Sequence, residues 1–271
     1  MSRALAAVWS LTAVGLGKRQ AVTWRRAWAL RERRFDALLM ALGTTMVLSL
    51  YFWLLPGVDL ALADAFHSPD AGFALSQSPV LKALRKSSTL GLVAVFLTAV
   101  ILMVRAGMRG GWRGLMTARR SWCVLAGLII GPVLLVNGLL KGQWGRPRPV
   151  HLEAFGGDAP YVEVWRVSDW CASNCSFVSG ESASAAWMVA AVVLLPQPWR
   201  GRLLLPVLTY GAALSVNRIA FGGHFLSDTL LSWSLVASVM ALLCAVLLPR
   251  VAEARVRRRH RDRAGALPAG S

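Results

Sequence analysis

Long apolar runs alternate with short polar or charged segments along most of this chain. Six runs reach or approach the roughly 20 residues that a helix needs to cross a bilayer. The second and fourth are short and borrow flanking residues such as Ser87–Ser88 or Glu181–Ser182. The pattern predicts an all-α fold, a polytopic membrane helical bundle with about six transmembrane helices. The six predicted spans are Ala37–Pro56, Thr89–Val104, Trp122–Leu140, Ala183–Leu195, Leu203–Ala220 and Leu230–Leu248.

The composition supports membrane embedding rather than a soluble fold. Hydrophobic residues make up 56% of the 271 positions, and the mean hydropathy is +0.52. A soluble domain of this length would not carry so many apolar runs. We therefore predict a membrane domain over residues 37–249, preceded by an N-terminal segment, 1–36, and followed by a tail, 250–271.

Basic residues are distributed unevenly between the two sides of the predicted bundle. Of the 30 Lys and Arg, 22 lie in the N-terminal segment, the loop 105–121, the turn 196–202 and the tail. The positive-inside rule places these segments, and both termini, in the cytoplasm. The net charge of +17 is not evidence of nucleic-acid binding, because no nucleic-acid-reading module accompanies it. The tail is interpreted as a disordered orientation signal that attracts anionic lipid.

The N-terminal segment has the beginnings of a signal peptide, with Arg3 before the apolar stretch Ala4–Gly17. However, Lys18–Arg19 follow it, and no small-residue cleavage pattern is present. Tryptophans spaced among arginines instead predict an amphipathic helix at the cytoplasmic interface.

Four cysteines divide by their location in the predicted topology. Cys123 and Cys244 lie inside apolar runs, where cysteine ordinarily packs as a small apolar side chain. Cys171 and Cys175 lie in an external loop, and an external compartment favours oxidation, so a disulfide is predicted there, with free thiols as the alternative. A metal pair is less well supported, because His151 is the only histidine in that loop.

Three polar clusters lie on the external side, each at the end of an apolar run. They are KGQWGRPRP (Lys141–Pro149), FVSGE (Phe177–Glu181) and NRIAFGGHFLSD (Asn217–Asp228). In the first, Lys141 follows Asn137 by four residues and shares its helical face. A lone lysine here would ordinarily extend to the membrane interface. The nearby Arg146 and Arg148 change this interpretation, because guanidinium groups bind phosphate oxygens in pairs.

The second and third clusters add a helix start and a potential nucleophile. Ser179 and Gly180 precede an apolar run, so free backbone N–H groups could bind phosphate there, although an ordinary helix cap is the alternative. In the third cluster, His224 precedes Asp228 by four residues. If both open the last helix, the carboxylate can hold one ring nitrogen while the other attacks. A lone histidine would be structural, but Arg218 upstream makes that interpretation less satisfactory.

The three clusters in this order resemble the type-2 phosphatidic acid phosphatase superfamily, the membrane branch of the fold shared with vanadium haloperoxidases. Its pattern is KxxxxxxRP, then PSGH, then SRxxxxxHxxxD. The first motif fits at Lys141 and Arg148–Pro149, and the third fits at Arg218, His224 and Asp228, with Asn217 in place of serine. The second fits only at Ser179–Gly180, since Val178 replaces proline and Glu181 replaces histidine. The resemblance covers about residues 37–248.

The resemblance implies a metal-independent phosphatase that needs no cofactor. His224 would form a phosphohistidine, and Asp228 would orient it. The cations that would neutralise the phosphate oxygens are Lys141, Arg148 and Arg218, and Ser179 and Gly180 would add hydroxyl and backbone donors.

Glu181 is the departure that matters, because the family's histidine at this position protonates the leaving group. A protonated Glu181 could donate, but neighbouring cations favour its ionised form. An ionised Glu181 could orient water or pair with a site arginine, or the step could be lost. We hypothesise activity on a substrate whose leaving group departs easily, such as a diphosphate or an anomeric sugar phosphate.

A site at the outer mouth of a bundle favours amphiphiles with a phosphate at the headgroup plane. The candidates are undecaprenyl diphosphate, lipid A phosphate and phosphatidylglycerol phosphate or phosphatidate, at the outer face of a bacterial inner membrane. The FGG segment and the SFVSGE motif look similar to lipid A phosphatase-like members. A phosphotransferase using the same residues is an alternative. A non-hydrolytic lipid binder or transporter is another, although it would have no use for an oriented His224.

Overall fold

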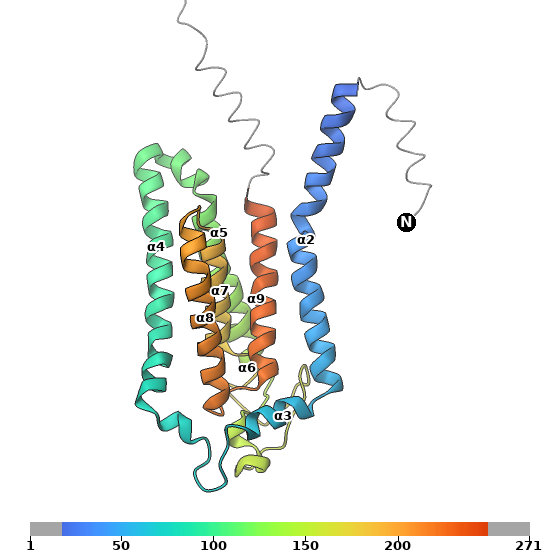
Figure 1. Cartoon of the computed structure of the whole chain (residues 1–271), viewed down its shortest axis with the longest axis vertical. Helices are drawn as coiled ribbons and strands as arrows, with labels where there is room; N and C mark the ends of the chain where they lie inside the picture. Colours follow the sequence, from blue (N-terminus) through green and yellow to red (C-terminus); the bar gives the residue numbers. More distant parts are fainter. Residues whose placement is uncertain (1–17, 249–271) are drawn as a thin grey trace, which may run out of the picture. The chain divides into compact units, whose positions relative to one another are not determined.

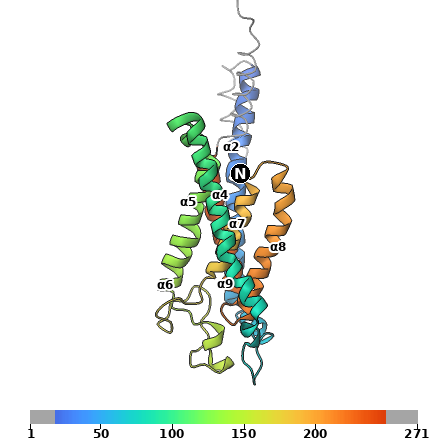
Figure 2. The same ribbon diagram turned by 90° about the vertical axis from the view of Figure 1, so that its left-hand side faces the viewer.

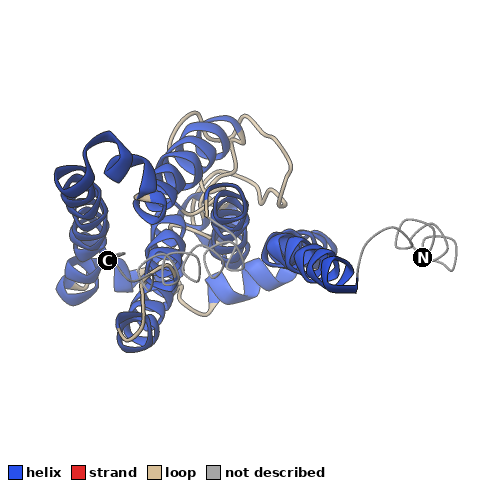
Figure 3. Ribbon diagram, turned by 90° about the horizontal axis from the view of Figure 1, so that it is seen from above, coloured by secondary structure: helices blue, strands red, loops and turns tan. Residues whose placement is uncertain are grey.

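The computed structural model describes residues 18–248, with side chains described from Phe35 onward. Residues 38–248 form one compact unit, and the described residues before them, 18–37, belong to a second. The described part of the second unit, residues 18–37, is helical. The predictions for residues 1–17 and for the basic tail lie outside the described residues. Helices and loops account for the described chain, and no strand occurs within it (Figure 3).

The main helices follow one another along the chain, and the longest connection is the loop 144–179 between α6 and α7. Their bounds are α2 Lys18–Leu54, α3 Gly57–Asp64, α4 Pro79–Thr117, α5 Arg119–Leu128, α6 Lys141–Gln143, α7 Gly180–Val193, α8 Trp199–Ala220 and α9 Leu226–Leu247. Single 3₁₀ turns occur at Ala74–Gln77, Pro149–His151 and Glu153–Phe155. The all-α membrane bundle predicted from the apolar pattern is confirmed.

Five helical stretches in the described chain are long and apolar enough to cross a membrane. The stretches are Phe35–Leu54, Pro79–Thr117, Arg119–Gln143, Trp199–Ala220 and Leu226–Leu247. The fourth predicted span, Ala183–Leu195, coincides with α7, which has only 14 residues. At 1.5 Å per residue, α7 is roughly 21 Å long and falls short of a hydrocarbon core of about 30 Å. The predicted count of about six is therefore five full spans and one short apolar helix.

The second predicted span, Thr89–Val104, is the middle of a much longer helix. Ser78 caps the start of α4, accepting a hydrogen bond from the backbone N–H of Leu81. The helix continues to Thr117, with one break at Gly111, whose φ of 55° lies in the left-handed region. Polar residues at both ends hid this length from an apolar count.

The third predicted span is not a regular α-helix throughout. After α5, residues Ile129–Leu140 form a π-helical segment that contains Pro132. The carbonyl of Pro132 accepts a hydrogen bond of 2.7 Å from the side-chain amide of Asn137, five residues later. A proline inside a helix disrupts the usual hydrogen-bond ladder, and here a polar side chain satisfies a backbone carbonyl. The segment ends where α6 begins, at Lys141.

Helix α7 lies inside the bundle, packed against α4, α5, α8 and α9 (Figures 1 and 2). Small residues dominate it, and Trp187 is its largest fully buried side chain. The indole N–H of Trp187 donates to the backbone carbonyl of Val124 on α5 at 2.8 Å. Helix α3 and the long loop 144–179 gather at the end of the bundle where α7 begins (Figure 1). That end, called the loop end below, holds the candidate site.

Candidate active site

His224 lies at the loop end, fully buried, in the turn between α8 and α9. Its Nδ1 is 2.7 Å from the backbone carbonyl oxygen of Ser176. A carbonyl can only accept a hydrogen bond, so Nδ1 carries the proton in the neutral ring and Nε2 keeps its lone pair. Burial lowers the pKa of His224 to about 4; Asp228 opposes this shift, and the charges of Arg218 and Lys141 add to it, but burial is the largest cause. The ring is therefore neutral and nucleophilic at pH 7.

The turn that carries His224 is built from the sequence FGG. At the end of α8, the N–H of Gly223 bonds to the carbonyl of Arg218 and the N–H of Gly222 to that of Ile219. This pair of bonds is a Schellman motif, which needs a left-handed residue, and Gly222 supplies it with φ of 63°. Helix α8 therefore ends sharply, and the chain reverses with His224 directed back into the bundle.

Asp228 lies in the first turn of α9, as predicted, but it does not hold His224 directly. Its Oδ2 is 3.8 Å from Nδ1 of His224, too far for a hydrogen bond. Oδ2 instead accepts from the hydroxyl of Ser176 and from the backbone N–H of Phe225. The expected direct contact fails because His224 precedes α9, so the four-residue helical spacing does not apply to the pair. Asp228 acts on His224 through Ser176, whose carbonyl holds the ring.

Arg146 does not join the phosphate cluster, contrary to the prediction. It is fully buried, and its guanidinium lies 2.7 Å from Oδ1 of Asp228 and 2.9 Å from Oδ2 of Asp59 on α3. It also donates to the carbonyl of Val162 and the hydroxyl of Ser227. Burial disfavours the charge of Arg146, but the two carboxylates overcome this and raise the pKa of the guanidinium. All of these contacts are structural: the Arg146 side chain links α3, the long loop and α9.

Lys141 and Arg218 approach the site over glycines. A Cβ at Gly180 would lie 3.4 Å from Nζ of Lys141 and 2.8 Å from Oδ1 of Asn137, so both side chains reach the start of α7 as their predicted shared face requires. A Cβ at Gly223 would collide with the guanidinium of Arg218. In both places a glycine allows a cation to approach the backbone next to the nucleophile.

Arg148 reaches the site from the long loop. Its Nε and Nη2 donate to the backbone carbonyl of Asn174 at 3.1 and 2.7 Å. Asn174 is one of the three residues between Cys171 and Cys175, whose disulfide is formed in the structure with Cα atoms 5.7 Å apart. Burial lowers the pKa of Arg148, and the positive charge of Arg85 lowers it further. The disulfide loop therefore carries the group that fixes Arg148.

The start of α7 combines a cap and the unusual glutamate. The hydroxyl of Ser179 accepts from the N–H of Ser182 at 3.4 Å, so Ser179 is the helix cap, the alternative weighed above. Oε1 of Glu181 lies 3.0 Å from Nε of Arg85 and 3.5 Å from Nε of Arg218. The other oxygen, Oε2, is buried without a hydrogen-bond partner among the described residues. Of the roles considered for Glu181 from the sequence, this geometry corresponds to an ionised carboxylate paired with site arginines.

Sequence reasoning missed several residues that the structure brings to this end. They are Arg85 on α4, Asp59 on α3, and Ser176 and Ser227, which bond to the two aspartates. For Arg85, the distribution of basic residues along the sequence could have pointed to a role. Only eight Lys and Arg fall on the predicted external side. Because basic residues are depleted on that side, each one found there is expected to have a charged partner or a function.

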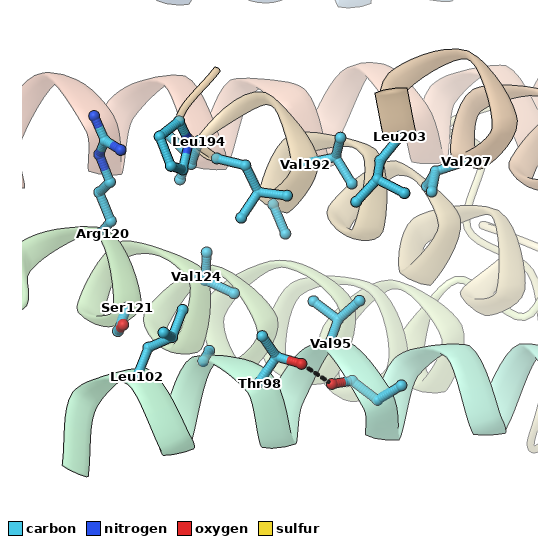
Figure 4. Close-up of a pocket in the computed structure, with 15 residues that line it drawn as sticks. Val95, Thr98, Leu102, Arg120, Ser121, Val124, Val192, Leu194, Leu203 and Val207 are labelled. Carbon is cyan, nitrogen blue, oxygen red and sulfur yellow. Dashed lines mark hydrogen bonds between the residues drawn. The ribbon is translucent and has the colours of Figure 1, made fainter. Parts of the chain in front are cut away.

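An apolar cavity of about 410 Å³ lies elsewhere in the bundle, among α4, α5, α7 and α8 (Figure 4). Its lining includes Arg120 at the start of α5, Leu194 after the end of α7 and Leu203 near the start of α8. The cavity is therefore at the opposite end of these helices from His224, and none of the predicted site residues lines it.

The comparisons with known proteins identify the family. The model of the PAP2 superfamily matches residues 120–253. The lipid A 4'-phosphatase of Rhizobium etli is 35% identical over 225 residues, which cover 78% of this chain and 88% of that protein. The chain belongs to the PAP2 superfamily. The family resemblance inferred from the motifs is confirmed.

Two further proteins are similar to this PAP2 chain. The lipid A 4'-phosphatase of Rhizobium leguminosarum is 41% identical over 129 residues, covering 48% of this chain and 55% of that protein. The transmembrane PAP2 type phosphatidylglycerolphosphate phosphatase of Bacillus subtilis is 19% identical, with a TM-score of 0.45, covering 76% of this chain and 93% of that one. The family and its named relatives make this PAP2 protein a membrane lipid phosphatase, a phosphoric monoester hydrolase.

Proposed function

We propose that this PAP2 protein hydrolyses a phosphomonoester of a lipid A-type glycolipid through a phosphohistidine on His224. The observation that carries the mechanism is the 2.7 Å contact between Nδ1 of His224 and the carbonyl of Ser176. It fixes the tautomer in which Nε2 is the free nucleophile. A neutral imidazole beside the cations Lys141 and Arg218 is suited to attacking an anionic phosphorus centre.

In the first step, Nε2 of His224 attacks phosphorus, and the ester P–O bond breaks with its electron pair passing to the lipid oxygen. Lys141, Arg148 and Arg218 neutralise the charge on the three remaining phosphate oxygens. The backbone N–H groups at Gly180, at the start of α7, add donors at a positive helix end. In the second step, water attacks the phosphohistidine, the P–N bond breaks, and inorganic phosphate leaves.

The substrate proposal follows from the two relatives named as lipid A 4'-phosphatases. A 4'-phosphate is the ester of an ordinary sugar hydroxyl, not of the anomeric one. Its leaving oxygen is strongly basic, so the site must stabilise it. This differs from the easily departing group hypothesised from Glu181, which stays a prediction, as do undecaprenyl diphosphate, phosphatidylglycerol phosphate and phosphatidate.

The location proposed is a bacterial inner membrane, with the loop end facing outward. The excess of Lys and Arg in the opposite segments supports this orientation. A disulfide in the long loop is consistent with an oxidising compartment. The lipid phosphates that reach the outer leaflet would then enter the site directly from the headgroup plane.

The test is phosphate release by the purified protein in detergent. The substrates are bis-phosphorylated lipid A, undecaprenyl diphosphate, phosphatidylglycerol phosphate and phosphatidate, and mass spectrometry locates the phosphate that is lost from lipid A. Loss of the 4'-phosphate with the highest kcat/KM is expected. His224→Ala should reduce the rate by at least about 1,000-fold, as removal of a nucleophile does.

Two outcomes would overturn the proposal. Release that persists in His224→Ala would exclude the phosphohistidine, and a preference for phosphatidate would exclude the glycolipid. Phosphate appearing on an added acceptor lipid in place of free phosphate would identify a phosphotransferase. No release from any lipid would point to a binding protein.

A further inference from the structure

The start of α4 is fixed against the site by contacts to neighbouring helices. The side-chain amide of Asn217 on α8 donates to the carbonyl of Leu81 at 3.1 Å. Six residues later, the hydroxyl of Ser87 lies 2.7 Å from that of Tyr210, also on α8. Arg85 lies between these two anchors. Its backbone is therefore held in place relative to Arg218, the residue that follows Asn217.

Only one edge of the Arg85 guanidinium is engaged. Nε lies 3.0 Å from Oε1 of Glu181, while neither terminal nitrogen has a hydrogen-bond partner among the described residues. The side chain is 49% exposed, whereas that of Glu181 is 22% exposed and that of Arg218 only 4%. Glu181 therefore fixes the direction of Arg85 and leaves its outer N–H groups available to a ligand.

Glu181 connects Arg85 to Arg218, the cation that packs beside the turn carrying the nucleophile. The guanidinium of Arg218 packs against Gly223, the neighbour of His224. Its Nε faces Glu181, and Glu181 in turn contacts Arg85. In phosphoryl transfer the attacking and leaving atoms are roughly in line on opposite sides of phosphorus. A phosphate held by Arg218 and attacked from His224 would direct its leaving oxygen toward Arg85.

We propose that Arg85, held by Glu181, is a catalytic residue that stabilises the leaving oxygen of the lipid. This inference rests on the proposed hydrolysis at His224. The two outer N–H groups of Arg85 would donate to the oxygen as it receives the P–O electron pair, and Arg85 would keep its protons. A water molecule then protonates the alkoxide, and the hydroxide formed attacks the phosphohistidine. One water is consumed, and alcohol and inorganic phosphate are released.

The diagnostic measurement compares two substrates that differ in their leaving group. An alkyl phosphate has a basic leaving oxygen that needs stabilisation, whereas 4-nitrophenyl phosphate has one that departs readily. Arg85→Ala should lower kcat on the alkyl phosphate by roughly 100-fold or more, as does loss of one oxyanion donor. The loss on the aryl phosphate should stay below about 10-fold. Inhibition by vanadate, a phosphate analogue, should change little and will show that the site remains folded.

Two further variants sharpen the comparison. Lys86→Ala removes the same charge from the next position of α4, where the side chain is exposed, and should leave both rates nearly unchanged. Glu181→Gln should reproduce part of the selective loss on the alkyl phosphate. Combining it with Arg85→Ala should add little, because both changes remove the same positioned guanidinium.

An equal loss on both substrates, or a rise in the vanadate inhibition constant, would overturn the proposal and make Arg85 a phosphate-binding cation. Unchanged rates in Arg85→Ala would also overturn it. The proposed function is tested separately by His224→Ala. If that variant turns over both substrates, the phosphohistidine mechanism fails whatever the Arg85 variants do.

Discussion

At the scale of single residues, the site depends on a histidine kept neutral in a cluster of cations. Ser176 holds the ring through its backbone carbonyl, and its hydroxyl donates to Asp228. A backbone carbonyl cannot take a proton, so this contact fixes the tautomer without competing for the proton. Asp228 therefore needs only to position Ser176, and its own charge is balanced by Arg146.

The protonation state of His224 can be measured directly, because the chain has only four histidines. Burial and the neighbouring cations lower the pKa of His224 to about 4 from 6.5. In ¹⁵N-imidazole NMR, one histidine should titrate near pH 4, with its signal absent from His224→Asn. A midpoint near 6.5 would contradict the buried geometry. Because the unfolded chain binds a proton here between about pH 6.5 and 4, this group should destabilise the fold as pH falls through that window.

The close approach of Arg218 to the turn makes Gly223 a sensitive position. In Gly223→Ala the new Cβ would displace the guanidinium, and a shift of about 1 Å at a catalytic group costs on the order of 100-fold in rate. We expect a loss of that order in kcat/KM for lipid phosphate release, without loss of folded protein. Gly142→Ala is the matched control, since a Cβ there meets nothing within 4 Å. Equal activity in the two variants would exclude a role for this contact.

Most residues that carry charge at the site could be predicted from the sequence, but their partners could not. Lys141, Arg218 and His224 were found because their spacing is fixed within single segments. The pairs Arg85–Glu181 and Arg146–Asp59 join segments 96 and 87 residues apart. No local periodicity reports such pairs. The sequence therefore grouped Arg146 with Arg148 in one cluster, although in the folded protein two carboxylates enclose Arg146.

At the scale of elements, the buried group of Arg146, Asp59 and Asp228 fixes the short helix α3 to the start of α9. The backbone N–H of Ser227 also donates to Oδ1 of Asp59 at 2.9 Å. The guanidinium of Arg146 lies over the ring of Phe225, 4.3 Å from its centroid. The same group supports the turn that carries His224, so stability and activity are coupled here.

Arg146→Met should leave two buried carboxylates without their cation. We expect a loss of about 3–5 kcal/mol, as when one partner of a buried ion pair is removed, measured as thermal unfolding in detergent. Arg166→Met breaks the exposed pair with Glu163, where Arg166 is 71% exposed, and should cost at most about 1 kcal/mol. A loss in Arg146→Met as small as in this control would show that the buried group is dispensable.

Element lengths were harder to predict than element types. The apolar pattern located the long helices of the described bundle and α7, but it missed the short helix α3, shortened α4 and lengthened α7 to a full span. α4 continues through polar and glycine residues at both ends, because a helix needs apolar residues only within the hydrocarbon. α7 is apolar because it is buried among other helices, not because it crosses lipid. Composition alone does not distinguish these two causes.

At the scale of the whole molecule, the charge asymmetry implies one orientation of the bundle in its membrane. The adjoining ends of α4 and α5 carry Arg113, Arg119 and Arg120, whereas the opposite end carries the proposed catalytic cluster and the disulfide. A lipid phosphatase in the reverse orientation would expose Cys171 and Cys175 to a reducing compartment. In the proposed orientation, both the substrate and the disulfide lie on the outer side.

Single cysteines at two exposed positions test this orientation in a background with Cys171→Ser and Cys175→Ser. Asp158→Cys reports on the long loop and Arg113→Cys on the α4–α5 turn. In intact spheroplasts a membrane-impermeant maleimide should label only Asp158→Cys, and lysis should expose Arg113→Cys. An unchanged thermal unfolding midpoint in detergent, relative to the same background without the new cysteine, controls for folding. The reverse pattern would place the loop end in the cytoplasm, where lipids of the outer leaflet cannot reach His224.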